Sequence, residues 1–105
     1  MSDSDGYPTE EELETIRNWN IIGKKEAKQL MEYVQSIWNF GDEYFKVKDA
    51  NNSIYYILHT GGWSGNEDII GALQENIHCF WLFYWLSTRR GGHYIFKIRN
   101  DIGIL

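Results

Sequence analysis

The sequence predicts an α+β fold in which helices pack on one four-stranded, mostly antiparallel sheet, in the order α-α-β-β-α-β-β. Three observations lead to this prediction. Residues 24–39 carry apolar side chains at helical spacing. Residues 44–48 alternate between apolar and polar side chains, as a strand does. Turn residues at 49–52 and 88–92 each separate two stretches rich in aromatic and β-branched side chains, which predicts two hairpins.

The first two helices are predicted from their caps and apolar stripes. Thr9 and Glu12 form a capping box, so the first helix begins after Thr9 and ends near Asn18. Gly23 marks a break, and a second helix follows from about Lys24 to Asn39, with Gly41 expected to close it. Its predicted apolar stripe consists of Ala27, Leu30, Met31, Val34, Ile37 and Trp38.

A hairpin and a short helix are expected next. Phe45 and Val47 should share one face of the first strand, with Lys46 and Lys48 on the other. The partner strand covers residues 53–59, and a glycine-rich connection leads to a short helix over about 67–75. The Ser-x-x-Glu pattern of Ser64 and Glu67 predicts a second capping box, and Ile69, Ile70 and Leu73 are expected to point inward.

An unusually aromatic stretch, residues 78–87, is interpreted as a long strand, paired through the 88–92 turn with a last strand over 93–98. Strict alternation would give this aromatic strand two apolar faces. Two alternatives follow and both stay open: helices cover both faces, or one face is left open as a binding surface.

Charge is unevenly distributed along the 105 residues, whose formal net charge is −5. Residues 1–18 carry six acidic side chains and one basic side chain, so the remainder is neutral overall. We expect residues 1–8 to be a flexible acidic leader and residues 9–105 to be a single domain. The acidity makes direct nucleic-acid binding unfavourable, because phosphates require basic surface.

Several other classes of protein are not expected. Cys79 is the single cysteine, which excludes an internal disulfide and is typical of a reducing compartment. The start of the chain does not resemble a signal peptide, and the longest apolar stretch, residues 77–86, is short for a membrane helix. The expected location is therefore the cytoplasm, that of the host cell if the chain is encoded by a phage, without a membrane partner.

The glycine-rich connection does not contain a complete catalytic or phosphate-binding motif. Ser64 stands where a nucleophile elbow would place its serine, but Asn66 replaces the final glycine of that pattern. A Walker lysine is missing, and Glu67 and Asp68 would repel a phosphate. His59, His78, Cys79 and His93 lack zinc spacing. No catalytic residue, metal or cofactor is therefore predicted.

A composite contact site is predicted where the glycine-rich connection and the 88–92 turn meet at one end of the sheet. Trp and Arg dominate interface hot spots, and glycines allow backbones to approach closely. An internal ion pair between an arginine of the turn and Glu67 or Asp68 is the alternative interpretation. The predicted contact residues are Trp63, Ser64, Asn66, Glu67, Arg89, Arg90 and His93.

The motif TGGWSGNEDII over residues 60–70, followed by Phe80-Trp81 and by RGGHY over residues 90–94, resembles a pattern in small uncharacterised phage and prophage proteins. The resemblance covers about the last half of the chain. It implies an accessory protein that interacts with a host protein, and no catalytic residues come with it.

The functional prediction is a non-enzymatic protein that binds a partner stoichiometrically, as an inhibitor of a host defence protein would. One alternative is a small-molecule or enzymatic cleft formed by Ser64, Asn66, Glu67, Arg90 and His93. A second alternative is mimicry of nucleic acid by the acidic first helix. A homodimer that closes an open aromatic face is a further possibility.

Overall fold

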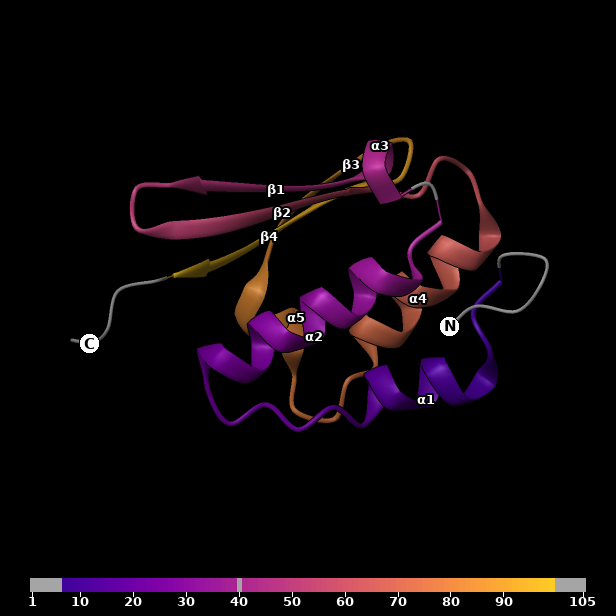
Figure 1. The fold of residues 1–105 in the computed structure, drawn as a ribbon, viewed down its shortest axis with the longest axis horizontal. Coiled ribbons are helices and arrows are strands. Elements are labelled where there is room, and N and C mark those ends of the chain that lie inside the picture. Colours follow the sequence, from indigo (N-terminus) through magenta and orange to yellow (C-terminus); the bar gives the residue numbers. More distant parts are fainter. Residues whose placement is uncertain (1–6, 40, 100–105) are drawn as a thin grey trace.

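A computed structural model describes residues 7–39 and 41–99 (Figure 1). The helices are α1 (Glu10–Arg17), α2 (Lys24–Ile37), α3 (Gly41–Tyr44), α4 (Ser64–Gln74) and α5 (Phe80–Tyr84). The strands are β1 (Phe45–Ala50), β2 (Ser53–His59), β3 (Trp85–Arg89) and β4 (His93–Arg99). They form one antiparallel sheet in the order β1-β2-β4-β3, which confirms the predicted α+β class. Residues 1–6 of the predicted acidic leader lie outside the described residues.

The two N-terminal helices form for the predicted reasons. The Thr9 hydroxyl accepts a hydrogen bond from the Glu12 amide at 3.1 Å, and the Glu12 carboxylate accepts one from the Thr9 amide at 2.9 Å, which completes the capping box. The predicted stripe of α2 is buried. The prediction that Gly41 closes α2 is wrong, because α2 ends at Ile37 and Gly41 begins α3. The backbone leaves helical geometry at Trp38, whose buried indole donates to the His59 carbonyl at 3.2 Å.

The first hairpin has the predicted turn, and its register determines which side chains share a face. Asn51 and Asn52 both have positive φ, as a tight hairpin turn with the strand twist requires. Phe45 pairs with Leu58, and both are buried. Val47 lies on the same face as Phe45 but is 49% exposed. The prediction that these residues share a face is confirmed, but only Phe45 reaches the core.

The aromatic segment does not form one long strand, so that prediction is wrong. Phe80–Tyr84 is a single helical turn, and only Trp85–Arg89 is a strand. Cys79 has left-handed backbone angles and breaks any extension from the N-terminal side. Helical spacing places Phe80 and Tyr84 on one face, with ring centroids 5.3 Å apart, and leaves Leu82 and Phe83 75% and 69% exposed. Tertiary packing of Phe80 therefore overrides the β propensity of its neighbours.

Helix α4 begins at Ser64, and Trp63 occupies the N-cap position without a side-chain hydrogen bond. The predicted capping box of Ser64 and Glu67 is therefore wrong. The Ser64 hydroxyl instead lies 3.4 Å from the Tyr7 hydroxyl. The prediction that Ile69, Ile70 and Leu73 point inward is confirmed.

The fold has two layers, with α1, α2, α4 and α5 on one face of the sheet and α3 at one end (Figure 1). Alternation along the paired strands directs one set of side chains toward the helices, and most of this set is buried. The sheet contributes Phe45, Tyr56, Leu58, Phe96 and Ile98 to the core. The opposite set of side chains faces away from the helical layer. We call this second face of the sheet the outer face.

Candidate functional site

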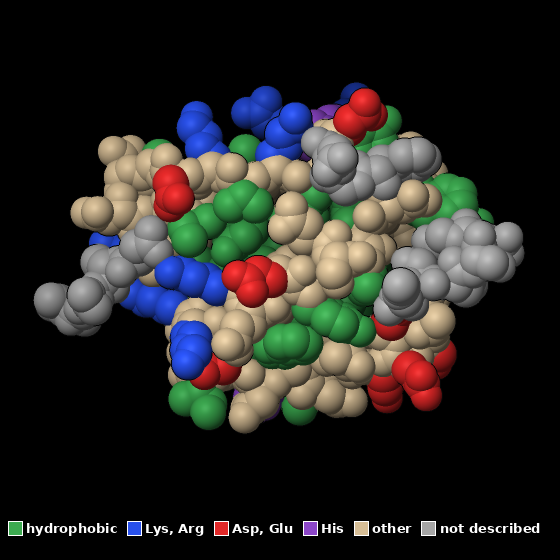
Figure 2. Space-filling model, viewed as in Figure 1, with side chains coloured by type: hydrophobic (Ala, Val, Ile, Leu, Met, Phe, Trp, Pro, Cys, Tyr) green, Lys and Arg blue, Asp and Glu red, His purple; other side chains and the backbone are tan. Residues whose placement is uncertain are grey.

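The outer face is a basic surface with an apolar middle. Its Lys and Arg side chains come from three strands, namely Lys46 and Lys48 from β1, Arg89 from β3, and Lys97 and Arg99 from β4. Tyr55, Ile57 and Ile95 occupy its centre, on the two middle strands. Lys and Arg side chains line the edge of the molecule above the sheet in Figure 2, opposite the helical layer. None of the described outward-facing strand positions carries Asp or Glu.

Acidic side chains gather at the other side of the molecule, around α1 (Figure 2). Two of them are partly neutralised, because the Arg17 guanidinium lies 3.1 Å from the Glu10 carboxylate and 2.8 Å from that of Glu14. The same guanidinium lies 2.7 Å from Glu75 at the end of α4. These ion pairs tie α1 to α4 and reduce the negative field that mimicry of nucleic acid would require.

Two adjoining depressions lie on the outer face. One, of about 320 Å³, is lined by Lys48, Ala50, Tyr55, Ile57, Leu86 and Ile95. The other, of about 310 Å³, is lined by Ile57, His59, Arg89, His93 and Ile95. Ile57 and Ile95 line both, so the two depressions form one continuous concave strip along the middle strands. A partner could therefore bury apolar side chains at the centre of the face while its acidic groups meet the surrounding cations.

A pair of histidines marks one end of this strip. The rings of His59 and His93 meet edge to face, with centroids 4.2 Å apart. The ring of Tyr44 from α3 lies 6.3 Å from that of His59, and Arg89 is the cross-strand neighbour of His93. Burial lowers the pKa of His59, and the nearby His93 and Lys46 lower it further. The uncharged form of His59 is therefore favoured in the folded protein.

This pKa shift makes a testable contribution to stability. The folded-state pKa of His59 lies below the ordinary value of 6.5, so below that pH the unfolded chain binds more protons. His59 therefore weakens the fold as the pH falls from about 6.5 through its folded pKa. We expect His59→Gln to lose less free energy of unfolding than the wild type between about pH 7.5 and about pH 5. Urea denaturation measures this difference, with His78→Gln, at an exposed histidine, as the control. Equal losses in His59→Gln and the wild type would contradict it.

The structure brings the two glycine-rich segments together. The Thr60 amide donates to the Gly92 carbonyl at 3.0 Å. Gly92 has a φ of +81°, and a Cβ there would collide with the Thr60 hydroxyl, so the contact requires glycine. The predicted convergence of the glycine-rich connection and the 88–92 turn is thus present at the backbone level.

The predicted contact residues of the glycine-rich connection lie in different environments. Trp63 is half-buried and packs against Tyr7, with ring centroids 4.7 Å apart and the rings tilted by 32°. Ser64 and Glu67 are exposed in the first turn of α4. Asn66 is 1% exposed and holds the backbone of Asn39 by accepting from its amide at 3.0 Å and donating to its carbonyl at 3.2 Å. Asn66 therefore connects the first turn of α4 to the segment between α2 and α3.

The predicted contact residues of the turn lie partly on the outer face. Arg89 and His93 line the same depression, and Arg90 is exposed in the turn itself. Within the described parts of the chain, neither arginine forms an ion pair with Glu67 or Asp68, so the internal ion pair of the alternative interpretation is not formed. Sequence reasoning missed Lys46, Lys97 and Tyr55 as site residues. The alternation of side chains along β1 and β4 indicates that these residues share a face of each strand. The order of the strands is needed to show that the two strands present them on the same face of the sheet.

The fold and the site define an α+β protein with a basic sheet face that none of the described helices covers. No family model, curated protein or solved structure matches the chain. Among the described helices none is long and apolar enough to cross a membrane. The described residues also contain no group of three or more His, Cys, Asp or Glu side chains placed to hold a metal ion.

Proposed function

We propose that the protein is a non-enzymatic binding protein whose outer face docks on an acidic surface of a partner protein. The observation that carries the proposal is the set of five cations on this face. None of the described strand residues that face outward there is acidic. A field of one sign steers an oppositely charged partner and selects against basic ones. The apolar strip at its centre provides the surface whose burial stabilises the complex.

The character of the centre favours a protein partner over single-stranded nucleic acid. Proteins that bind single strands present several aromatic rings on which bases stack. Here the middle of the strip is mostly aliphatic, formed by Ile57 and Ile95 with Leu86 beside them. Tyr55 is the aromatic side chain of that depression, and Lys97 lies over its ring at 5.7 Å. An aliphatic centre framed by charges matches the core and rim of a protein interface.

Stoichiometric binding is also favoured over the cleft that the sequence left open as an alternative. Asn66 is buried in the first turn of α4, Ser64 lies beside Tyr7, and His93 faces outward next to His59. These side chains occupy separate environments, and such a dispersal supports an interaction surface more than a catalytic site. Inhibition of a host defence protein is one form of such binding, and it rests on the resemblance to phage and prophage proteins alone.

A charge-reversal experiment tests the proposal. Lys46→Glu/Lys48→Glu alters two exposed residues of edge strand β1, whereas the matched control Lys25→Glu/Lys28→Glu makes the same charge change on α2. The full chain is immobilised, proteins are captured from an extract of its source cells, and the captured partner is identified by mass spectrometry. It is then purified and titrated with each variant. We expect the outer-face variant to bind about tenfold or more weakly, because each reversal removes an attraction and adds a repulsion.

Three further results complete the test. Binding by the wild type should weaken as salt is raised, and both double variants should keep the unfolding temperature of the wild type. Equal affinity of the wild type and the outer-face variant would overturn the proposal. Tight binding of a twenty-nucleotide deoxythymidine oligomer, lost in the same variant, would also overturn it and assign the face to nucleic acid instead.

A further inference from the structure

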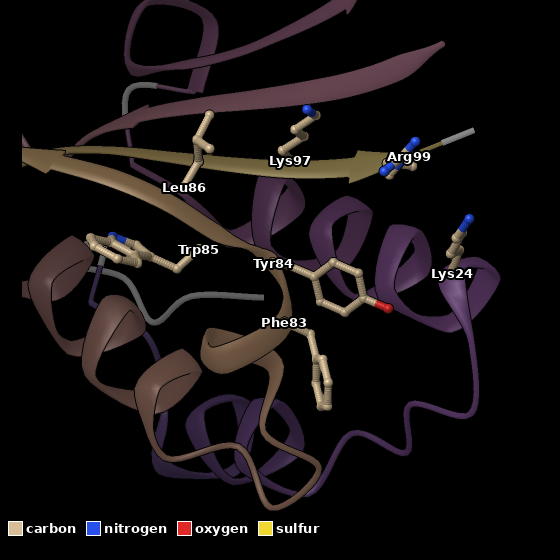
Figure 3. A pocket seen from close by; sticks show the side chains of 7 residues that line it. All are labelled: Lys24, Phe83, Tyr84, Trp85, Leu86, Lys97 and Arg99. Atoms are coloured by element: carbon tan, nitrogen blue, oxygen red, sulfur yellow. The ribbon is translucent and has the colours of Figure 1, made fainter. Parts of the chain in front are cut away.

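A separate cavity of about 320 Å³ lies beside the outer face, where α5 passes into β3 (Figure 3). It is lined by Lys24, Phe83, Tyr84, Trp85, Leu86, Lys97 and Arg99. These residues come from the start of α2, from α5 with β3, and from the end of β4. The cavity shares Leu86, Lys97 and Arg99 with the outer face but extends away from the sheet toward the start of α2.

Three cationic side chains surround this cavity, and none of the described residues that line it is acidic. Lys24 approaches from α2, while Lys97 and Arg99 extend from β4 (Figure 3). Burial raises the pKa of Tyr84, and the nearby Glu26 raises it further. The Glu26 carboxylate is occupied at 2.9 Å by the Gly23 amide, as part of the α2 N-terminus. The charge of the lining therefore favours an anion.

Aromatic side chains form the remaining wall of the cavity. The Tyr84 ring stands in its middle, and its hydroxyl points toward the side where Lys24 and Arg99 lie (Figure 3). Burial is the larger cause of the raised pKa of Tyr84, so this hydroxyl stays protonated and can donate to an anion at neutral pH. Phe83 is directed to the lower side of the cavity, and Leu86 lies on the opposite side (Figure 3). A flat apolar body would find contacts here that inorganic phosphate cannot make.

We propose that this cavity binds a small molecule with a phosphate monoester group and an aromatic ring, the two features that phenyl phosphate and a nucleoside 5′-monophosphate share. The phosphate group lies among Lys24, Lys97 and Arg99, and the ring packs beside Tyr84. A phosphate monoester carries a charge of about −1.5 to −2 at neutral pH, which suits three cations better than a single carboxylate does. The volume of the cavity lies at the lower end of the range for small-molecule sites.

Titrations followed by amide chemical shifts of the labelled full chain test the proposal with four probes: phenyl phosphate, adenosine 5′-monophosphate, adenosine and inorganic phosphate. We expect both monoesters to bind at least about tenfold more tightly than inorganic phosphate or adenosine, with shifts centred on residues 83–86. Lys24→Glu should weaken this binding about tenfold, whereas the adjacent, non-lining Lys25→Glu should leave it within about twofold. A stronger response to the nucleotide than to phenyl phosphate would support the proposal and name the nucleotide as the source.

Several results would overturn the proposal. If inorganic phosphate binds as tightly as the monoesters, the site recognises only the charged phosphate group and makes no favourable contact with an aromatic ring. Unchanged affinity in Lys24→Glu would place any binding elsewhere. Lys24 is not part of the outer face, and Lys46 and Lys48 do not line this cavity, so the two sets of variants test the two proposals independently. The unfolding temperature of each variant confirms that it has folded.

Discussion

Replacing Phe80 with alanine is expected to reduce the free energy of unfolding by about 3–5 kcal/mol. The Phe80 side chain is completely buried, and its ring centroid lies 5.5 Å from that of Phe96 on β4 and 5.3 Å from that of Tyr84. Its removal leaves a cavity between the sheet and α5 that a core of this size cannot refill. The midpoint of thermal unfolding should fall by more than about 10 °C.

The matched control for this substitution lies three residues further along the same helical turn. Phe83→Ala removes the same atoms from a side chain that is 69% exposed, so its effect on stability should be within about 0.5 kcal/mol. Urea denaturation of the two variants measures the difference. Similar losses at Phe80 and Phe83 would contradict the helical turn, because a buried strand would have to cover both rings.

Replacing Asn66 with leucine is expected to cost about 2–4 kcal/mol of stability, although leucine has a similar size. The amide of Asn66 satisfies the N–H and the C=O of Asn39, and leucine would leave both of these backbone groups without that partner. The Thr60 carbonyl, which also accepts from the Asn66 amide at 3.4 Å, would keep its bond from the Trp63 amide. The expected loss of stability thus comes from the two unsatisfied backbone groups of Asn39, which lies between α2 and α3.

Two variants sharpen this second prediction. Asn66→Asp keeps the oxygen that accepts from Asn39 but loses the donor, so its loss should be intermediate. Ser64→Ala, at an exposed residue with one long contact to Tyr7, should change stability by less than about 0.5 kcal/mol. Chemical denaturation of all three variants ranks them. An Asn66→Leu variant as stable as the wild type would refute the structural role of this side chain and leave it available as a contact residue.

Local patterns were sufficient for much of the fold because they act within a few residues. The capping box of Thr9, the stripe of α2 and the Asn51-Asn52 turn each depend on neighbours in the chain, and all three are present. The prediction for the aromatic segment was wrong because its structure depends on residues far away in the chain. A run of aromatic side chains satisfies both helix and strand patterns when it is buried, and the left-handed backbone at Cys79 and the packing of Phe80 against Phe96 determine the result.

The candidate site was also predictable only in part. The two glycine-rich segments meet through the bond between Thr60 and Gly92, as the composite contact site requires, and Arg89 and His93 lie in one depression. The uneven distribution of charge along the chain did not indicate where the lysines of β1 lie. These lysines share a face with Lys97 only because β2 lies between β1 and β4 in the sheet. Cross-strand neighbours of this kind are set by long-range pairing, which no local pattern contains.

The sequence by itself determined the α+β class, the order of the main elements and the composition of the helical side of the core, because helix and strand periods and caps are local properties. Only the tertiary structure decided that all the large helices cover one face of the sheet, which leaves the cations of three strands together on the other (Figures 1 and 2). It also decided that the aromatic segment turns at Tyr84 and thereby forms the wall of a cationic cavity. Both features arise from contacts between residues far apart in the chain, whose net free energy depends on burial and strand order rather than on local propensity.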